Sequence, residues 1–218
     1  MTDRRTLAYV APFAAFIALL ALQSVAPTPA WVRLLVPLAV ILIFSRGVLA
    51  EGRLARPAMS VLVGLAVFVI WVAPDYLAPG YHDLPLFSNS LLGHAVSSLV
   101  TAQKSSFWPL LFRVLVSVVA VPVLEELFWR GWLMRWIIDR EFWRIPLGTY
   151  RAGAFWIVAL LFASEHGPYW DVGLLAGIIY NGWMLRTRSL WDCILAHAVT
   201  NALLAAWVIT RGEWQYWL

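Results

Sequence analysis

The sequence predicts an all-α fold, a polytopic transmembrane helical bundle of about seven to eight spans in a single membrane domain covering residues 1–218. Hydrophobic residues make up 62% of the chain and charged residues only 13%, whereas soluble domains carry about 25% charged residues. Several apolar stretches approach the length of about 20 residues that a helix needs to cross a bilayer. Arginines also concentrate in alternate loops. We therefore expect an integral, multi-pass membrane protein.

Seven apolar stretches are the expected spans. They cover residues 7–25, 31–44, 57–77, 106–138, 152–166, 172–185 and 190–210. The segment 75–90 is rich in Pro, Gly and Asp and is predicted to be an external loop. The segment 91–102 is too short to cross, so we expect a helix lying on the membrane surface; a crossing there would be the eighth. Basic loops are expected at 46–56 and 139–151.

The basic residues test this layout. One side of the predicted bundle carries Arg4, Arg5, Arg46, Arg53, Arg56, Arg135, Arg140, Arg144, Arg151, Arg186 and Arg188. The other side carries only Arg33, Lys104 and Arg211, so the crowded side should be cytoplasmic, in a bacterial inner membrane. The basic residues form no single patch, so lipid headgroups of the bilayer are the expected partner and nucleic acid is not. The only cysteine, Cys193, excludes an internal disulfide.

Two adjacent carboxylates, Glu125 and Glu126, interrupt the apolar run 106–138. Arg130 follows Glu126 by four residues, so these two side chains share a helix face and can pair. Glu125 points about 100° away and stays free of that pair. An ionisable group at membrane depth is costly unless paired, so it marks a functional site by default. Pro122 should kink this helix and free a backbone carbonyl.

Two later spans carry further polar groups. His166 follows Phe162 by one helical turn, and His197 and Asn201 share a face of the last span. Counted from the expected cytoplasmic ends at about 1.5 Å per residue, Glu125 and His166 both lie roughly 21 Å deep. Asn201 lies roughly 18 Å deep and His197 roughly 12 Å. Groups from three spans therefore converge on one level.

These residue types can hydrolyse a peptide bond. Glu125 beside an imidazole can activate water as a general base, and a second imidazole with an amide can stabilise the oxyanion. Glu125, His166 and His197 can also act as zinc ligands, so both metal-free and zinc-assisted routes remain open. The chain lacks a His-Glu-x-x-His helix, and the amide of Asn201 is a poor zinc ligand. These two points favour the metal-free route, with no required cofactor.

Two other functions compete with hydrolysis. Buried Glu and His residues also carry ions in small ion-coupled transporters, and a catalytically inactive membrane scaffold is the third alternative. Transporters often show repeats with polar groups in both halves, whereas the polar groups here lie in the second half and no repeat is visible. His82 and His94 lie outside the spans and are expected to be incidental. Glu165 is expected to face water at a helix end.

Three motifs, in this order, resemble the CPBP family of intramembrane proteases, which includes the CAAX prenyl endopeptidase. They are Glu125-Glu126-Leu-Phe-Trp-Arg130, Phe162-Ala-Ser-Glu-His166 and His197-Ala-Val-Thr-Asn201. The resemblance covers residues 106–206, a family-like catalytic core. The chain also resembles the CAAX-protease-related proteins that accompany bacterial exosortase systems.

The resemblance implies a membrane bundle that cleaves a membrane protein or a lipidated peptide, prenylated or sorting-tagged. It implies that Glu125 and His166 activate the water and that His197 and Asn201 stabilise the oxyanion. The supporting residues that it implies are Glu126, Arg130 and Phe162. The family has been classed among metalloproteases, although its structural picture favours a glutamate-based mechanism.

Overall fold

The computed structural model describes residues 4–23, 25–26 and 28–217, and these residues form helices and loops with no β-strand. The all-α prediction is therefore confirmed for this part of the chain. Residues 1–3, 24, 27 and 218 lie outside the described residues, and of these residue 24 falls within the first expected span, 7–25.

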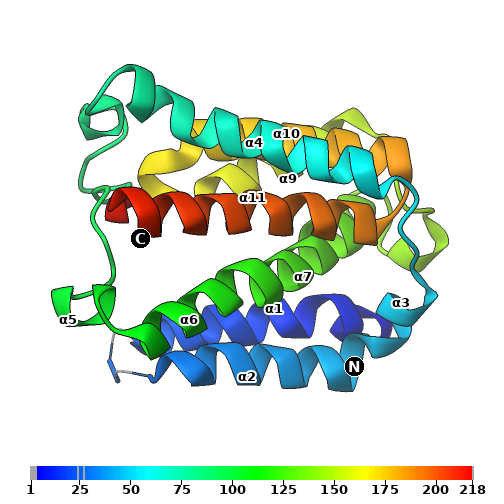
Figure 1. Cartoon of the computed structure of the whole chain (residues 1–218). Helices are drawn as coiled ribbons and strands as arrows, with labels where there is room; N and C mark the ends of the chain where they lie inside the picture. The colour runs from blue at the N-terminus through cyan, green and yellow to red at the C-terminus, as the bar shows by residue number, and fades with distance from the viewer. Residues whose placement is uncertain (1–3, 24, 27, 218) are drawn as a thin grey trace.

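Within the described residues, seven long helical stretches run back and forth along one direction (Figure 1). They are α1 (Arg4–Gln23); α2 (Ala30–Val40) continuing through η1 (Ile41–Ser45) into α3 (Arg46–Glu51); α4 (Pro57–Leu77); α6 (Phe107–Leu115) continuing through η3 (Val116–Ala120), α7 (Val121–Glu126) and η4 (Leu127–Leu133) into α8 (Met134–Trp136); α9 (Ala152–Ser164); α10 (Trp170–Thr187); and α11 (Leu190–Arg211). The segments η1, η3 and η4 are π-helical. The short elements are α5 (Thr101–Lys104) and the 3-10 turns η2 (Tyr81–Asp83), η5 (Phe142–Arg144), η6 (Gly167–Tyr169) and η7 (Trp214–Tyr216).

Five of these stretches are long and apolar enough to cross a membrane. They are Arg4–Gln23, Ala30–Glu51, Pro57–Leu77, Phe107–Trp136 and Leu190–Arg211. The helix α9 is apolar but shorter, with 13 residues. Apolar side chains such as Leu42 and Ile43 are about two-thirds exposed on the flanks, where lipid would cover them. The protein is therefore an integral membrane protein.

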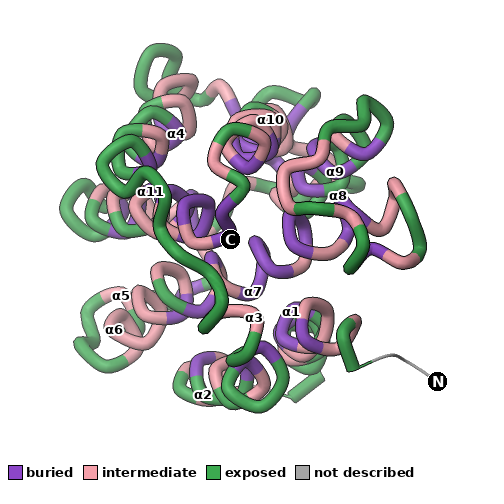
Figure 2. Tube along the Cα trace, turned by 90° about the vertical axis from the view of Figure 1, so that its right-hand side faces the viewer, coloured by how far each residue is buried: buried purple, intermediate pink, exposed green. Residues whose placement is uncertain are grey.

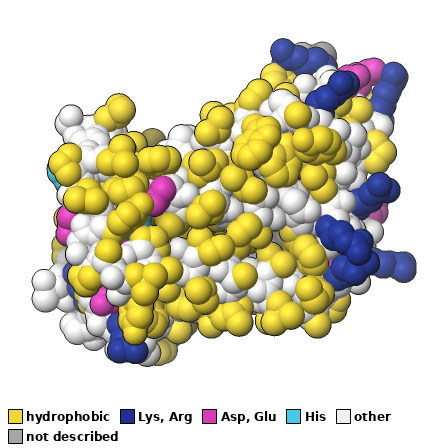
Figure 3. Space-filling model, turned by 90° about the horizontal axis from the view of Figure 1, so that it is seen from above, with side chains coloured by type: hydrophobic (Ala, Val, Ile, Leu, Met, Phe, Trp, Pro, Cys, Tyr) yellow, Lys and Arg dark blue, Asp and Glu magenta, His cyan; other side chains and the backbone are white. Residues whose placement is uncertain are grey.

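The two ends of the bundle differ in charge. Figure 3 shows hydrophobic side chains along the flank and most Lys and Arg side chains gathered at one end. We call this the arginine-rich end; it contains the start of α1 and the loops 52–56, 137–151 and 188–189. The opposite end contains the loops 78–106 and 165–169 and the segment 212–217. This alternation agrees with the arginine pattern in the sequence.

Two predicted segments were wrong. The second helix extends to Glu51 rather than ending at residue 44, because η1 continues into α3, which occupies the first part of the expected basic loop 46–56. The expected surface helix at 91–102 is mostly turns and bends, and only its end enters α5. There Asn89 Oδ1 accepts the Leu91 and Leu92 N–H groups, and Ser98 N–H donates to Trp217 O. Backbone donors that bond elsewhere cannot build a helix.

Small residues bring the helices close together. A Cβ on Gly64 of α4 would clash with Ala196 O of α11, and one on Gly177 of α10 would lie 3.2 Å from the Ala159 backbone of α9. Such contacts are typical of membrane bundles, where close packing drives helix association. Figure 2, which looks at the arginine-rich end, shows buried stretches of α1, α7, α10 and α11 turned toward the centre.

The long helix Phe107–Trp136 continues past Pro122 without a break. In the π-helical turn the Val121 N–H donates to Val116 O. In this register the backbone N–H of residue 122 would donate to Ser117 O. Residue 122 is a proline, which has no N–H. Asn201 Nδ2 of α11 donates to Ser117 O instead, at 2.8 Å. Pro122 thus frees a carbonyl, as expected, and α11 uses it as an anchor.

Candidate active site

A cavity of about 300 Å³ lies between α1, the long helix Phe107–Trp136, α10 and α11. Its wall includes all four predicted catalytic residues, Glu125, His166, His197 and Asn201, together with Phe162. Apolar side chains of α1 close another side of it. The structure therefore brings together groups that lie up to 76 positions apart in the sequence.

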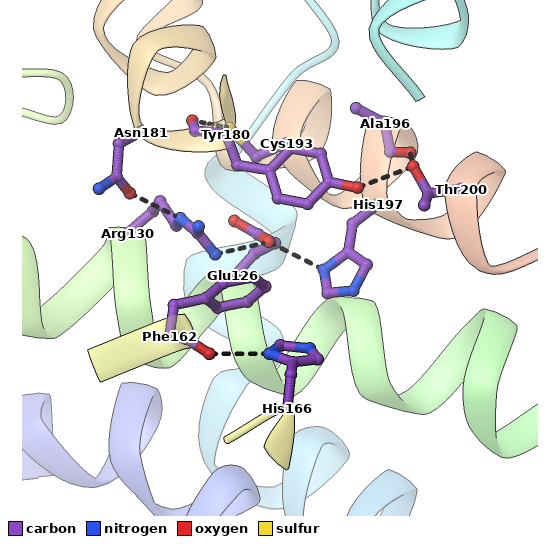
Figure 4. Close-up of polar contacts among 10 residues, drawn as sticks. All are labelled: Glu126, Arg130, Phe162, His166, Tyr180, Asn181, Cys193, Ala196, His197 and Thr200. Carbon is purple, nitrogen blue, oxygen red and sulfur yellow. Dashed lines mark hydrogen bonds and ion pairs between the residues drawn. The ribbon is translucent and has the colours of Figure 1, made fainter. Parts of the chain in front are cut away.

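Glu126 forms a buried ion pair with Arg130, as predicted (Figure 4). Arg130 Nη1 donates to Glu126 Oε1 at 3.0 Å, and both side chains are fully buried. His197 Nδ1 lies 3.0 Å from the same oxygen, a contact that the sequence did not reveal. A buried carboxylate needs such partners because its desolvation costs several kcal/mol.

Arg130 has two further kinds of partner. Its Nε donates to Asn181 Oδ1 at 3.0 Å, and Asn181 Nδ2 donates to Phe155 O at 2.9 Å. Its guanidinium lies 4.5 Å from the ring centroid of Phe162 and 5.4 Å from that of Tyr180. Asn181 and Tyr180 were missed from the sequence; a polar pair inside an apolar helix was the available signal.

Glu125 lies one residue earlier and has a different environment. It lines the cavity, and its Oε2 has no hydrogen-bond partner among the described residues. It is therefore free of the Glu126–Arg130 pair, as expected from the rotation of about 100° between neighbours on a helix. A buried carboxylate without a partner is suited to bind water or substrate.

His166 is oriented by its own helix. Its Nδ1 lies 2.8 Å from Phe162 O, and a carbonyl can only accept, so Nδ1 carries the proton of the neutral ring. Nε2 then presents a lone pair. The ring packs edge-on against Trp71, 5.1 Å away between centroids, and against Gly173, whose hydrogen leaves it room.

His197 and Asn201 are fixed by α10 and by the π-helical turn. The ring of His197 stacks on Tyr180, with centroids 5.2 Å apart, and the Tyr180 hydroxyl donates to Thr200 Oγ1 at 2.7 Å. Asn201 donates one side-chain N–H to Ser117 O. Its amide has a second N–H, which remains for another acceptor.

Glu125, His166 and His197 were also candidate zinc ligands from the sequence. Among the described residues, no three His, Cys, Asp or Glu side chains are placed so that they could hold a metal together. Glu125, His166 and His197 line the same cavity without forming such a set.

The expectation that His82 is incidental was wrong. His82 is 2% exposed; its Nδ1 lies 2.7 Å from Asp75 Oδ2 and its Nε2 lies 3.0 Å from Asp171 Oδ1. Burial alone would lower the pKa of His82, but hydrogen bonds to Asp171 and Asp75 raise it to about 9. His94 is exposed, and Glu165 is exposed at the end of α9, where it also borders the cavity.

Residues 106–203 match the model of a protein family described as Rce1-like, type II CAAX prenyl endopeptidase Rce1-like. The resemblance inferred from the three motifs is therefore confirmed over this segment. The chain matches no curated protein and no solved structure at a significant level. The family match supports an intramembrane endopeptidase activity in general terms, on a membrane-associated protein substrate.

Proposed function

We propose that this chain, whose segment 106–203 carries the CAAX endopeptidase pattern, hydrolyses a peptide bond of a lipidated or sorting-tagged membrane protein. The observation that carries the proposal is the convergence of Glu125, His166, His197 and Asn201 on one cavity between apolar helices. Catalytic residues held on rigid helices keep their geometry, and the apolar walls exclude bulk water.

Glu125 is the proposed general base. A water molecule binds between its carboxylate and the Nε2 lone pair of His166. As the water oxygen attacks the substrate carbonyl carbon, its proton passes to Glu125 and the carbonyl oxygen becomes an oxyanion. Glu125 then returns the proton to the amide nitrogen as the C–N bond breaks. The products are a carboxylic acid and an amine, and Glu125 regains its starting form.

His197 and Asn201 are the proposed donors to the oxyanion. Asn201 offers its second N–H, and His197 offers Nε2–H when its ring carries both protons. Glu126 supplies the counter-charge at Nδ1, as the buried aspartate does in a Ser-His-Asp triad. Arg130 and Phe162 keep Glu126 in position.

The proposed reaction requires no cofactor. The arginine-rich end lies in the cytoplasm of a bacterium in this proposal, with the bundle in the inner membrane.

Because the proposed reaction requires no metal, chelation of the purified protein should leave cleavage intact. Complete loss on chelation, restored by zinc alone, would replace this mechanism with a metal-assisted one.

The test uses purified protein in lipid nanodiscs and a panel of membrane-anchored peptides analysed by mass spectrometry. We expect wild type to cleave and Glu125→Gln to lose about 10²–10⁴-fold in kcat, as for removal of a general base. Glu141→Gln is the matched control, because Glu141 pairs with Arg144 on the surface of the arginine-rich end. Equal cleavage by wild type and Glu125→Gln would overturn the proposal.

A further inference from the structure

A second cavity, of about 480 Å³, lies at the opposite end of the bundle. Three carboxylates and four aromatic rings contribute to its wall. They belong to Asp75, Asp83, Glu213, Tyr76, Tyr169, Trp207 and Tyr216. Tyr169 and Tyr216 also line the cavity that holds Glu125, so the two cavities share a wall. We call this second cavity the acidic pocket.

The acidic pocket has a surplus of negative charge. The carboxylates among its lining residues are those of Asp75, Asp83 and Glu213, and the lining cation is His82, which contacts Asp75. Arg211 lies nearby, with its guanidinium 5.0 Å from the ring centroid of Trp207. Three carboxylates against one imidazolium leave a formal charge of −2 among the lining residues. This charge favours a cationic ligand.

A buried, unpartnered hydroxyl points to a ligand independently of the charge. Tyr169 is 2% exposed, and its hydroxyl has no hydrogen-bond partner among the described residues. Burial raises the pKa of Tyr169, and the nearby Asp75, Asp83 and Glu213 raise it further, so the phenol keeps its proton. Its oxygen can accept a hydrogen bond from a cationic N–H. A buried polar group without a partner is destabilising, and a ligand that donates a hydrogen bond to it would offset that cost.

The lining favours an organic cation over a metal ion. In the part of the chain that the structure describes, no three acidic, His or Cys groups are placed to ligate a metal together. Aromatic faces beside carboxylates suit a guanidinium or an ammonium group, which gains from cation–π contact and from charged hydrogen bonds. Trp207 already holds one guanidinium, that of Arg211.

We propose that the acidic pocket is a specificity subsite that binds the cationic side chain of an arginine or lysine in the substrate, close to the bond that is cleaved. The inference rests on the proposed function, because the wall shared with the catalytic cavity makes the substrate chain the source of the cation. The subsite would select peptides whose basic residue reaches the opposite end while the scissile bond lies beside Glu125.

Asp83 and Glu213 are the carboxylates available to the ligand. Both oxygens of Asp75 already have partners: its Oδ1 accepts the His82 backbone N–H at 3.2 Å, and its Oδ2 contacts the His82 ring and the Tyr216 hydroxyl. Asp83 is exposed, and Glu213 is partly exposed with Oε2 accepting from Gln215. Asp83→Asn with Glu213→Gln therefore removes two charges without disturbing the buried His82 pairs.

The test compares membrane-anchored peptides that differ only in arginine or its neutral isostere citrulline, placed at successive positions near the cleaved bond. At the best position, we expect wild type to favour arginine about tenfold in kcat/KM, a size typical of one cation–π contact with a charged hydrogen bond. In the variant Asp83→Asn/Glu213→Gln, the ratio of kcat/KM for the arginine peptide to that for the citrulline peptide should fall toward one. Glu51→Gln/Glu141→Gln removes two charges at the arginine-rich end, from the exposed Glu51 and from Glu141, whose side chain is 45% exposed, and should keep the wild-type ratio of arginine to citrulline cleavage.

A binding measurement separates this inference from the proposed function. The same peptides are titrated into nanodiscs carrying Glu125→Gln, with and without the two pocket substitutions. Arginine-selective binding that the pocket substitutions abolish would support the subsite even if no peptide is cleaved. Equal binding of arginine and citrulline peptides at every position would overturn it. The inference would also be overturned if choline or ethanolamine lipids, but not the peptides, bound to the acidic pocket.

Discussion

A single oxygen, Glu126 Oε1, accepts hydrogen bonds from two elements at once, from Arg130 on its own helix and from His197 on α11. It therefore joins the buried ion pair to a residue of the proposed oxyanion site. The neighbouring Glu125 has a carboxylate oxygen with no such partner. Adjacent glutamates should consequently respond differently to the same substitution.

We expect Glu126→Ala and Arg130→Ala each to lower folded yield, because removing one partner leaves the other charge buried, at a cost of about 3–5 kcal/mol. The double variant Glu126→Leu/Arg130→Met should recover yield but not cleavage, because His197 still lacks its Nδ1 partner. Size-exclusion chromatography measures yield, and peptide cleavage measures activity. Equal yields for all three variants would contradict a buried pair.

Two glycines of α10 offer a matched comparison at the same scale. A Cβ on Gly173 would lie 3.1 Å from His166 Nδ1, whereas a Cβ on Gly182 would meet nothing within 4 Å. Gly173→Ala should displace His166 by a few tenths of an ångström and lower kcat about tenfold, because catalysis is sensitive to small misplacements. Gly182→Ala, with the same gain in helix propensity, should keep wild-type kcat. Similar kcat values for the two variants would argue that the position of His166 is unimportant.

At the scale of elements, the long helix Phe107–Trp136 and α11 are tied together where the backbone of the helix is incomplete. The π-helical turn and Pro122 leave Ser117 O without a backbone donor, and Asn201 supplies one. This tie also places the second N–H of Asn201 near the cavity. Folding and chemistry therefore depend on the same side chain.

The two roles of Asn201 can be separated. Asn201→Leu should lower folded yield, because an unpaired buried carbonyl costs about 1–3 kcal/mol. Adding Pro122→Ala supplies a backbone N–H in register with Ser117 O and should restore the yield. Cleavage should stay about 10²–10³-fold below wild type, as for loss of one oxyanion donor. Recovery of cleavage together with yield would reduce Asn201 to a structural role.

At the scale of the whole molecule, the two ends of the bundle are built differently. The arginine-rich end presents cations to lipid headgroups, whereas the opposite end holds its loops through the buried His82 pairs. Those pairs connect the loop 78–90 to α4 and α10, and Tyr216 connects the segment 212–217 to the same Asp75. The stability of this end should therefore depend on the protonation of His82.

The pKa of His82 is raised to about 9 in the folded protein, from 6.5. The corresponding stabilisation is fully present below about pH 6.5 and is lost as the pH rises through about 9, a loss of about 1–3 kcal/mol. Thermal unfolding in detergent should show the melting temperature falling between pH 6 and pH 10. In His82→Gln the melting temperature should depend less on pH over this range. A wild-type profile that is flat across this range, or one that His82→Gln leaves unchanged, would contradict the assignment.

The sequence predicted those features that are local or periodic. The long apolar runs located the helices, and the spacing of Glu126 and Arg130 predicted their pair because residues four apart share a helix face. The cluster of Asp75, His82 and Asp171 could not be predicted, because 89 positions separate His82 from Asp171 and no spacing connects them. The contact of Asn201 with Ser117 also depends on a π-helical register that composition does not reveal.

The π-helical turn Val116–Ala120 also makes the site sensitive to chain length. A π-helical turn holds one residue more than the α-helical turn it replaces, and each residue of an α-helix adds about 100° of rotation. Deleting one residue there would let the turn become α-helical and would rotate the segment Phe107–Leu115 by about 100° against Glu125. Arg113, which borders the cavity from that segment, would turn away from it. One additional residue in this turn is therefore enough to set the rotation of the start of the helix relative to its glutamates.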